Sequence, residues 1–207
     1  LYEREYTFDN LDTTQPIKEI DIDMDGTIGN FAIISIYINC WQYINKTKEY
    51  PPYEIFSWFF EAGGFRPFLK EFVSYIYNLR QEGKIEKINI NTSVNNHNGY
   101  VSWISKCLDK YCKLDNIIDN IYDRNTSLGI AQCGATIKKI KPTTVLLDDK
   151  PWNVDLFNRA INVPYYEHKI DHEPFYKMFR EEDKEILQQA LLYDEINYPP
   201  KPTDFLN

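Results

Sequence analysis

Six acidic and hydroxyl-bearing residues stand in three pairs, and each pair comes at the end of a stretch with strand-like patterning. The pairs are Asp23 and Asp25, Thr92 and Ser93, and Asp148 and Asp149. If the three stretches are neighbouring parallel strands, their carboxyl ends meet at one edge of the sheet, where ligands bind in such folds. Four crowded carboxylates repel one another unless a cation lies among them. An all-oxygen, anionic ligand set suits Mg²⁺ held together with a substrate phosphate. The spacing therefore indicates a magnesium site and a phosphate ester as substrate.

The elements that must position these residues can be read from hydrophobic periodicity. Residues 17–23 and 87–93 alternate apolar and polar side chains, which is typical of strands, and residues 145–147 form a short, fully apolar strand. Residues 65–80 have helical spacing, and a second amphipathic helix follows residue 93. The apolar stripes are Phe68, Leu69, Phe72, Tyr75, Ile76 and Leu79 on the first helix, and Tyr100, Trp103, Ile104, Cys107 and Leu108 on the second. Strands separated by helices predict an α/β fold with a parallel sheet and crossover helices.

The chain has 207 residues, a length that favours one domain over residues 1–207. Within it, residues 30–64 are rich in Ile, Tyr, Trp and Phe and are too long for a simple loop. We expect them to form a small helical cap inserted after the first strand. The last amphipathic helix is predicted over residues 181–192.

Charge and composition exclude several classes of partner. Lys and Arg number 23 against 31 Asp and Glu, a net charge of −8, which argues against a broad face for extended nucleic acid. No apolar run approaches the roughly 20 residues that cross a bilayer, and no signal-peptide pattern opens the chain, so we expect no membrane partner. The four cysteines lack zinc-like spacing and are expected to be free thiols in a cytoplasmic protein. A homo-oligomer is compatible with these features.

The run Asp23-Met-Asp-Gly-Thr27 matches the Asp-x-Asp-x-Thr signature of the haloacid dehalogenase superfamily of phosphotransferases. Thr92 resembles the second motif of that superfamily, and Asp148-Asp149 its fourth. The resemblance implies a three-layer Rossmannoid sheet and Mg²⁺ held by Asp23, by the backbone carbonyl of Asp25 and by the fourth-motif acids. It also implies that Asp23 attacks phosphorus to form an aspartyl-phosphate. Asp25 would protonate the leaving oxygen and then activate water.

A closer resemblance is to the 5'(3')-deoxyribonucleotidase family. It covers the runs at residues 23–31, 90–93 and 147–151 and the Trp103 within the helix between them. Members carry a phosphate-binding lysine ten residues before the first acid of the last motif, and Lys138 stands ten residues before Asp148. The resemblance implies a nucleoside monophosphate substrate, with Thr92, Ser93 and Lys138 at the phosphate.

Several alternatives remain open at this point. Lys139 and Lys141 compete with Lys138 for the phosphate, and Phe31 and Trp58 are either stacking partners for a nucleobase or ordinary packing residues of the insertion. The run Phe65-Arg-Pro67 before a helix would also fit a small protein phosphatase of the same superfamily, similar to the CTD phosphatases. A catalytically silent binding protein with this fold is a further alternative.

Polar residues within two of the predicted strands do not fit the usual pattern. Central parallel strands are normally continuous apolar runs, yet Glu19 and Asp21 alternate along one strand and Asn89 and Asn91 along another. We therefore expect one face of the sheet to be partly exposed to solvent or to contact a partner.

Overall fold

The computed structural model describes residues 16–126, 141–185 and 188–189. Within them lies an all-parallel, five-stranded sheet of order β3-β2-β1-β4-β5. The strands are β1 (Glu19–Ile22), β2 (Lys87–Asn91), β3 (Asn120–Tyr122), β4 (Thr144–Asp148) and β5 (Arg159–Asn162). This topology, with helices between the strands, confirms the predicted α/β fold class with a parallel sheet and crossover helices.

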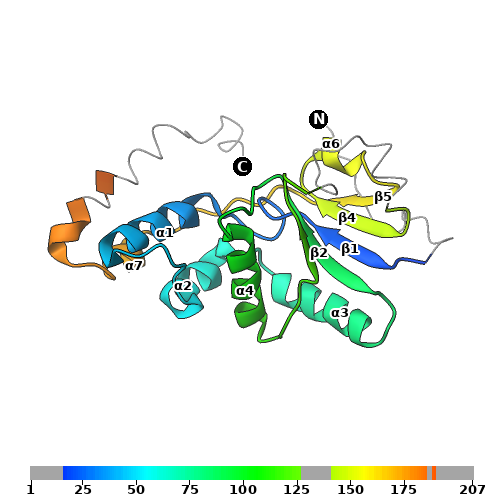
Figure 1. The fold of residues 1–207 in the computed structure, drawn as a ribbon, viewed down its shortest axis with the longest axis horizontal. Helices are drawn as coiled ribbons and strands as arrows, with labels where there is room; N and C mark the ends of the chain where they lie inside the picture. The colour runs from blue at the N-terminus through cyan, green and yellow to red at the C-terminus, as the bar shows by residue number, and fades with distance from the viewer. Residues whose placement is uncertain (1–15, 127–140, 186–187, 190–207) are drawn as a thin grey trace.

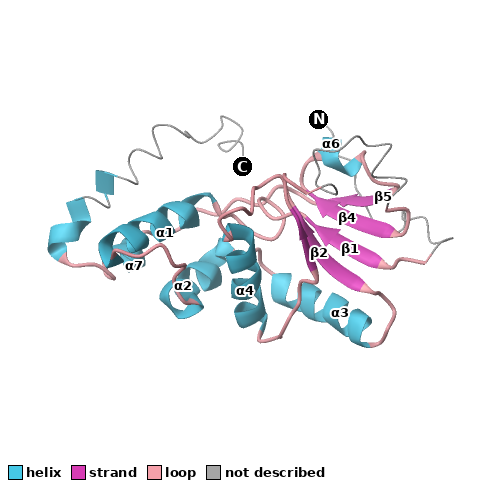
Figure 2. Ribbon diagram, in the orientation of Figure 1, coloured by secondary structure: helices cyan, strands magenta, loops and turns pink. Residues whose placement is uncertain are grey.

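The helices divide between the sheet and the opposite end of the molecule. They are α1 (Ala32–Asn45), α2 (Tyr53–Phe59), the π-helix η2 (Phe60–Gly64), α3 (Leu69–Gln81), α4 (Tyr100–Cys112), α6 (Pro151–Val154) and α7 (Glu173–Tyr176). Figures 1 and 2 show α1, α2 and α7 at the end away from the strands, and α4 between them and the sheet. Helix α6 packs against β4 and β5. Among the described helices, none has the length and apolar character needed to span a membrane.

The apolar face of the sheet packs against α3 and α4. Ile20 and Ile22 of β1 and Ile88 and Ile90 of β2 belong to the main core cluster, since alternate side chains of a strand share one face. Helix α4 buries Val101, Trp103, Ile104, Cys107, Leu108 and Cys112 in the same core. The helix and the buried stripe predicted after residue 93 are therefore confirmed, with Tyr100 only partly buried.

The predicted boundaries and stripe of α3 are partly wrong. The helix begins at Leu69 rather than at residue 65, because Phe65 pairs with Gly29 in an antiparallel bridge. Phe68 has a left-handed φ of 63° and is 80% exposed, and Tyr75 is 62% exposed. The helix instead buries Leu69, Val73 and Ile76, at the i, i+4, i+7 spacing of a narrow apolar stripe.

The helices α1, α2 and η2 lie within residues 30–64, the segment expected to form a cap. Of the predicted last helix, residues 181–185 and 188–189 are helical, and the rest lies outside the described residues. Cys40, Cys107 and Cys112 are buried free thiols, and Cys133 lies outside the described residues.

The polar face of the sheet is buried at its centre, so the predicted exposure to solvent is wrong for Asp21 and Asn89, whereas Glu19 on the same face is partly exposed. Asp21 and Asn89 are both 0% exposed. The Asp21 carboxylate accepts hydrogen bonds from Asn89 (2.8 Å) and Asn91 (3.0 Å) and pairs with the ammonium of Lys141 (2.6 Å). The lysine supplies the opposite charge and the amides supply hydrogen-bond donors. The Asp21 carboxylate can therefore be buried without remaining unpaired.

Removing the Lys141 charge is expected to destabilise the chain strongly. Lys141→Met leaves the Asp21 carboxylate buried without its counter-ion, a change that typically costs about 3–5 kcal/mol. Denaturant unfolding monitored by circular dichroism measures this. Lys18→Met is the matched control, because Lys18 forms an exposed pair with Glu86 and should change the unfolding free energy by less than about 1 kcal/mol. Equal effects of the two substitutions would contradict the proposed importance of the buried pair.

Candidate active site

The parallel register of β1 and β4 brings the predicted acids side by side. Ile22 is paired with Leu147, and the Asp23 N–H donates to the Leu147 carbonyl at 2.9 Å, so Asp23 and Asp148 occupy neighbouring positions. One carboxylate oxygen from each of Asp23, Asp148 and Asp149 lies within 4.8 Å of the other two. All three residues are buried. The structure therefore assembles an acidic cluster at the carboxyl edge of the sheet.

The loop after β1 is tightly turned around this cluster. Gly26 has a left-handed φ of 81°, which favours glycine, and its N–H donates to the Gly29 carbonyl at 2.8 Å. The Thr27 hydroxyl lies 3.4 Å from a carboxylate oxygen of Asp23 and 3.4 Å from one of Asp149. Thr27 can thus donate a hydrogen bond to either acid and helps to hold both in place.

Asp148, the last residue of β4, and Asp149 after it are held by residues at the start of α6. Asp148 accepts hydrogen bonds from the Lys150 backbone N–H at 2.7 Å and from the Asn153 side-chain amide at 3.0 Å. The Lys150 ammonium pairs with the Asp149 carboxylate and lies 4.5 Å from the centre of the Tyr165 ring. Sequence reasoning did not assign Lys150 to the site. Its position directly after the acid pair was the available signal.

Burial and mutual repulsion disfavour the charged forms of these acids. Burial, followed by the negative charge of Asp148, raises the pKa of Asp23 to about 9. Burial raises the pKa of Asp25 and of Asp148 to about 6 each. Neighbouring carboxylates repel one another when all of them are ionised. A hard divalent cation that binds oxygen ligands neutralises this negative charge. The residues present therefore fit Mg²⁺.

The predicted phosphate-binding residues fall in different places. Thr92 is buried directly beyond the carboxyl end of β2, the neighbour of β1, so it lies at the same sheet edge as Asp23. Ser93 is exposed. Lys138, like its alternative Lys139, lies outside the described residues.

Lys141, the other alternative to Lys138 as the phosphate-binding lysine, contacts residues of β1 that precede Asp23. Its ammonium is 2.6 Å from Asp21, 3.6 Å from Glu19 and 4.1 Å from the centre of the Tyr122 ring. Glu19 and Asp21 both lie on β1 before Asp23, and Lys141 is thus engaged in the buried polar face.

The two aromatic residues predicted to stack on a base are packed within the insertion. Phe31 is 2% exposed and meets Phe65 edge-on at 5.7 Å between ring centres. Trp58 lies 5.8 Å from Tyr37, and its buried Nε1 has no hydrogen-bond partner within the described residues. Their role at a base stays a prediction.

Comparison with known proteins finds structural similarity only. No family model matches the chain, and no curated protein matches it. Among solved structures, the chain is similar to fission yeast RNA polymerase II CTD phosphatase Fcp1-R271A bound to beryllium fluoride. The identity is 18%, the TM-score is 0.43, and the match covers 86% of this chain. It covers 51% of that chain, so this sequence spans about half the length of the matched structure.

Mg²⁺ is expected to stabilise the chain, and more so at higher pH. In the folded state, burial and the charge of Asp148 raise the pKa of Asp23 to about 9, and burial raises the pKa of Asp148 to about 6, both above the ordinary aspartate value of about 3.9. The metal-free folded state therefore holds protons that the unfolded state releases, and its stability falls as the pH rises from about 4 to 9. Because protons compete with the metal, the rise in Tm with Mg²⁺ should be larger at pH 8 than at pH 5.5.

Differential scanning fluorimetry measures this dependence. Asp149→Asn is the test variant: it should raise the Tm of the metal-free chain, because it removes repulsion, and reduce the Mg²⁺ effect. An Mg²⁺ shift that is the same in this variant and at both pH values would contradict a metal site at these acids.

Proposed function

We propose that this chain is a Mg²⁺-dependent phosphate monoester hydrolase of the haloacid dehalogenase type, acting through an aspartyl-phosphate on Asp23. The observation that carries the proposal is the buried cluster of Asp23, Asp148 and Asp149, with Asp25 two residues after the first acid. Such a cluster is costly to fold, and strongly perturbed acids of this kind are concentrated at functional sites.

The chemistry divides between the two acids of the turn. The Asp23 carboxylate attacks phosphorus, a new P–O bond forms, and the bond from phosphorus to the leaving oxygen breaks. Asp25 gives its proton to that oxygen. Asp25 then takes a proton from water, which attacks the aspartyl-phosphate and releases inorganic phosphate with Asp23 restored. A pKa of about 6 suits Asp25 to both proton transfers near neutral pH.

The other residues of the site would bind the metal ion and the phosphate or orient the carboxylates. The Asp23 carboxylate, the Asp25 backbone carbonyl, Asp148 and Asp149 would hold Mg²⁺, which when bound neutralises negative charge on the transferring phosphoryl group. Thr92 is proposed to contact the phosphate from the end of β2, with Ser93 and Lys138 as the further candidates. Thr27 keeps the Asp23 and Asp149 carboxylates oriented.

A nucleoside monophosphate is the proposed substrate class. A cavity of about 490 Å³ lies between α1, the segment before α2 and the loop after β2, within the range typical of small-molecule sites. Its lining is mixed, with Lys48, Tyr50, Tyr100 and several amide side chains. The Tyr100 hydroxyl donates to the Phe31 carbonyl at 3.3 Å, and burial and the nearby Asp25 carboxylate raise the pKa of Tyr100. Tyr100 lines this cavity and feels the charge of Asp25, which supports placing the leaving group of a nucleoside monophosphate there.

Asp23→Asn should abolish turnover while the chain stays folded. The amide cannot attack phosphorus, and loss of a catalytic nucleophile typically costs about 10³-fold or more in kcat. Hydrolysis of p-nitrophenyl phosphate with Mg²⁺ measures this, and circular dichroism checks the fold. Asp155→Asn, at an exposed position, is the matched control and should retain full activity. Residual activity of Asp23→Asn above a tenth of the unmodified rate would refute the nucleophile assignment.

The substrate class needs a separate experiment. A panel of nucleoside monophosphates, sugar phosphates and phosphopeptides is assayed for phosphate release by the unmodified chain. The highest kcat/KM is expected for a nucleoside monophosphate. A preference for phosphopeptides would replace this substrate class with the protein phosphatase alternative, and no release from any ester would refute the enzymatic proposal.

A further inference from the structure

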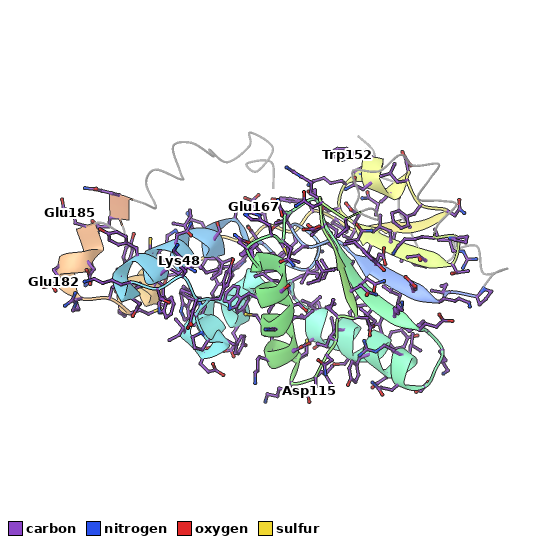
Figure 3. The ribbon with its side chains drawn as sticks, viewed as in Figure 1. Lys48, Asp115, Trp152, Glu167, Glu182 and Glu185 are labelled. Carbon is purple, nitrogen blue, oxygen red and sulfur yellow. The ribbon has the colours of Figure 1, made fainter. Side chains whose placement is uncertain are left out.

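A short segment after β5 contacts both the catalytic turn and the end of the helical insertion. The Tyr166 backbone N–H donates to the Gly26 carbonyl at 2.9 Å, and the Tyr166 hydroxyl donates to the Gly63 carbonyl at 2.7 Å. Figure 1 shows this gold segment running from β5 toward α7, and Figure 3 labels the next residue, Glu167, between the sheet and α1. One residue thus bridges two segments that are 37 positions apart.

Arg66, just after the insertion, also joins the turn after β1 to the segment after β5. Its guanidinium donates to the carbonyls of Thr27 (2.8 Å), Gly26 (2.7 Å) and Pro164 (2.5 Å). It also lies 5.2 Å from the centre of the Tyr166 ring, the distance of a cation–π contact. A planar guanidinium with several donors can fix backbone oxygens from different segments at once.

The two connections of the insertion are themselves paired where they meet. Asn30 N–H donates to the Gly64 carbonyl and Arg66 N–H to the Ile28 carbonyl, both at 2.9 Å. A Cβ on Gly29 would lie 2.2 Å from the Gly64 carbonyl oxygen, and one on Gly63 would lie 2.5 Å from the His168 ring. The backbones are therefore in close contact at this point, and a small displacement of one segment is passed to the others.

We propose that Arg66 and Tyr166 are positioning residues that fix the helical insertion relative to the turn carrying Asp23 and Asp25. This inference rests on the proposed function. It explains how the cavity beside α1 keeps its position relative to the carboxylates of Asp23 and Asp25. Neither side chain takes part in the chemistry. We call the contacts of Arg66 and Tyr166 with the turn, with Gly63 and with Pro164 the clamp. Residues 164–166, which contribute to it, are far along the chain from the insertion.

The two residues should differ in their effects on catalysis. Arg66 contacts the carbonyls of Gly26 and Thr27 in the turn itself, so its loss should lower kcat for every ester. The Tyr166 hydroxyl contacts only the end of the insertion, so its loss should weaken binding of leaving groups that fill the cavity. Small esters that reach only the carboxylates should be unaffected.

The test variant is Tyr166→Phe, which removes the hydroxyl and keeps the ring beside Arg66 and the backbone N–H to Gly26. We expect KM for the best nucleoside monophosphate to rise about fivefold to tenfold, the usual scale for losing one hydrogen bond, with kcat/KM for p-nitrophenyl phosphate unchanged. Tyr75→Phe is the matched control, because Tyr75 is 62% exposed on α3. Arg66→Lys should lower kcat for both esters.

Hydrogen exchange read by mass spectrometry gives a measure that does not depend on activity. Tyr166→Phe should increase exchange in peptides covering residues 26–31 and 60–66, and Tyr75→Phe should not. Unchanged exchange in both peptides overturns the inference, and so does an equal loss of kcat/KM for both esters, which indicates general destabilisation. If the unmodified chain hydrolyses no ester, the proposed function fails, and the exchange result alone decides whether the clamp exists.

Discussion

Mutual repulsion among three buried carboxylates is the constraint around which the rest of the structure is arranged. The repulsion follows from topology, because β1 and β4 are neighbouring parallel strands in a register that places Asp23 beside Asp148. The surroundings offset part of it through the Lys150 ammonium, the Asn153 amide and the Thr27 hydroxyl. Burial, followed by the negative charge of Asp148, nevertheless raises the pKa of Asp23 to about 9. A chain selected only for stability would not retain such a cluster, which is why its chemistry directs the functional proposal.

The strands that carry the acids were predictable because their signal is local. Alternating or continuous apolar residues ending in Asp or Thr mark β1, β2 and β4, and the rule that ligands gather at the carboxyl edge of parallel strands needs no tertiary information. The strand β3 is only three residues long, and β5 has neither an alternating nor a continuous apolar pattern, so periodicity does not distinguish them from loops. The start of α3 was misplaced for a related reason: the pairing of Phe65 with Gly29 joins residues 36 positions apart and interrupts an otherwise helical pattern.

Polar contacts between residues far apart in the chain could not be predicted from the sequence. Asp21 on β1 resembles a solvent-facing residue by pattern, and its burial is explained by Lys141, 120 positions later. Arg66 and the Tyr166 hydroxyl donate to backbone carbonyls. Because every residue has such a carbonyl, the amino-acid sequence does not show which ones act as acceptors. Nothing in the run Phe65-Arg-Pro67 itself indicates that Arg66 binds the turn after β1 and residue 164.

The buried polar face and the acidic cluster of Asp23, Asp148 and Asp149 are parts of one electrostatic arrangement. Asp21 lies on β1 and Asp23 directly follows the last residue of that strand, so their Cα atoms are separated by only about 7 Å. An unpaired Asp21 would add a further negative charge to the three acids in a medium that screens weakly. Lys141 neutralises Asp21 within the sheet, and the repulsion that remains is confined to the edge, where a cation can enter. The same pairing that makes a polar strand interior tolerable therefore also limits the charge that the metal has to neutralise.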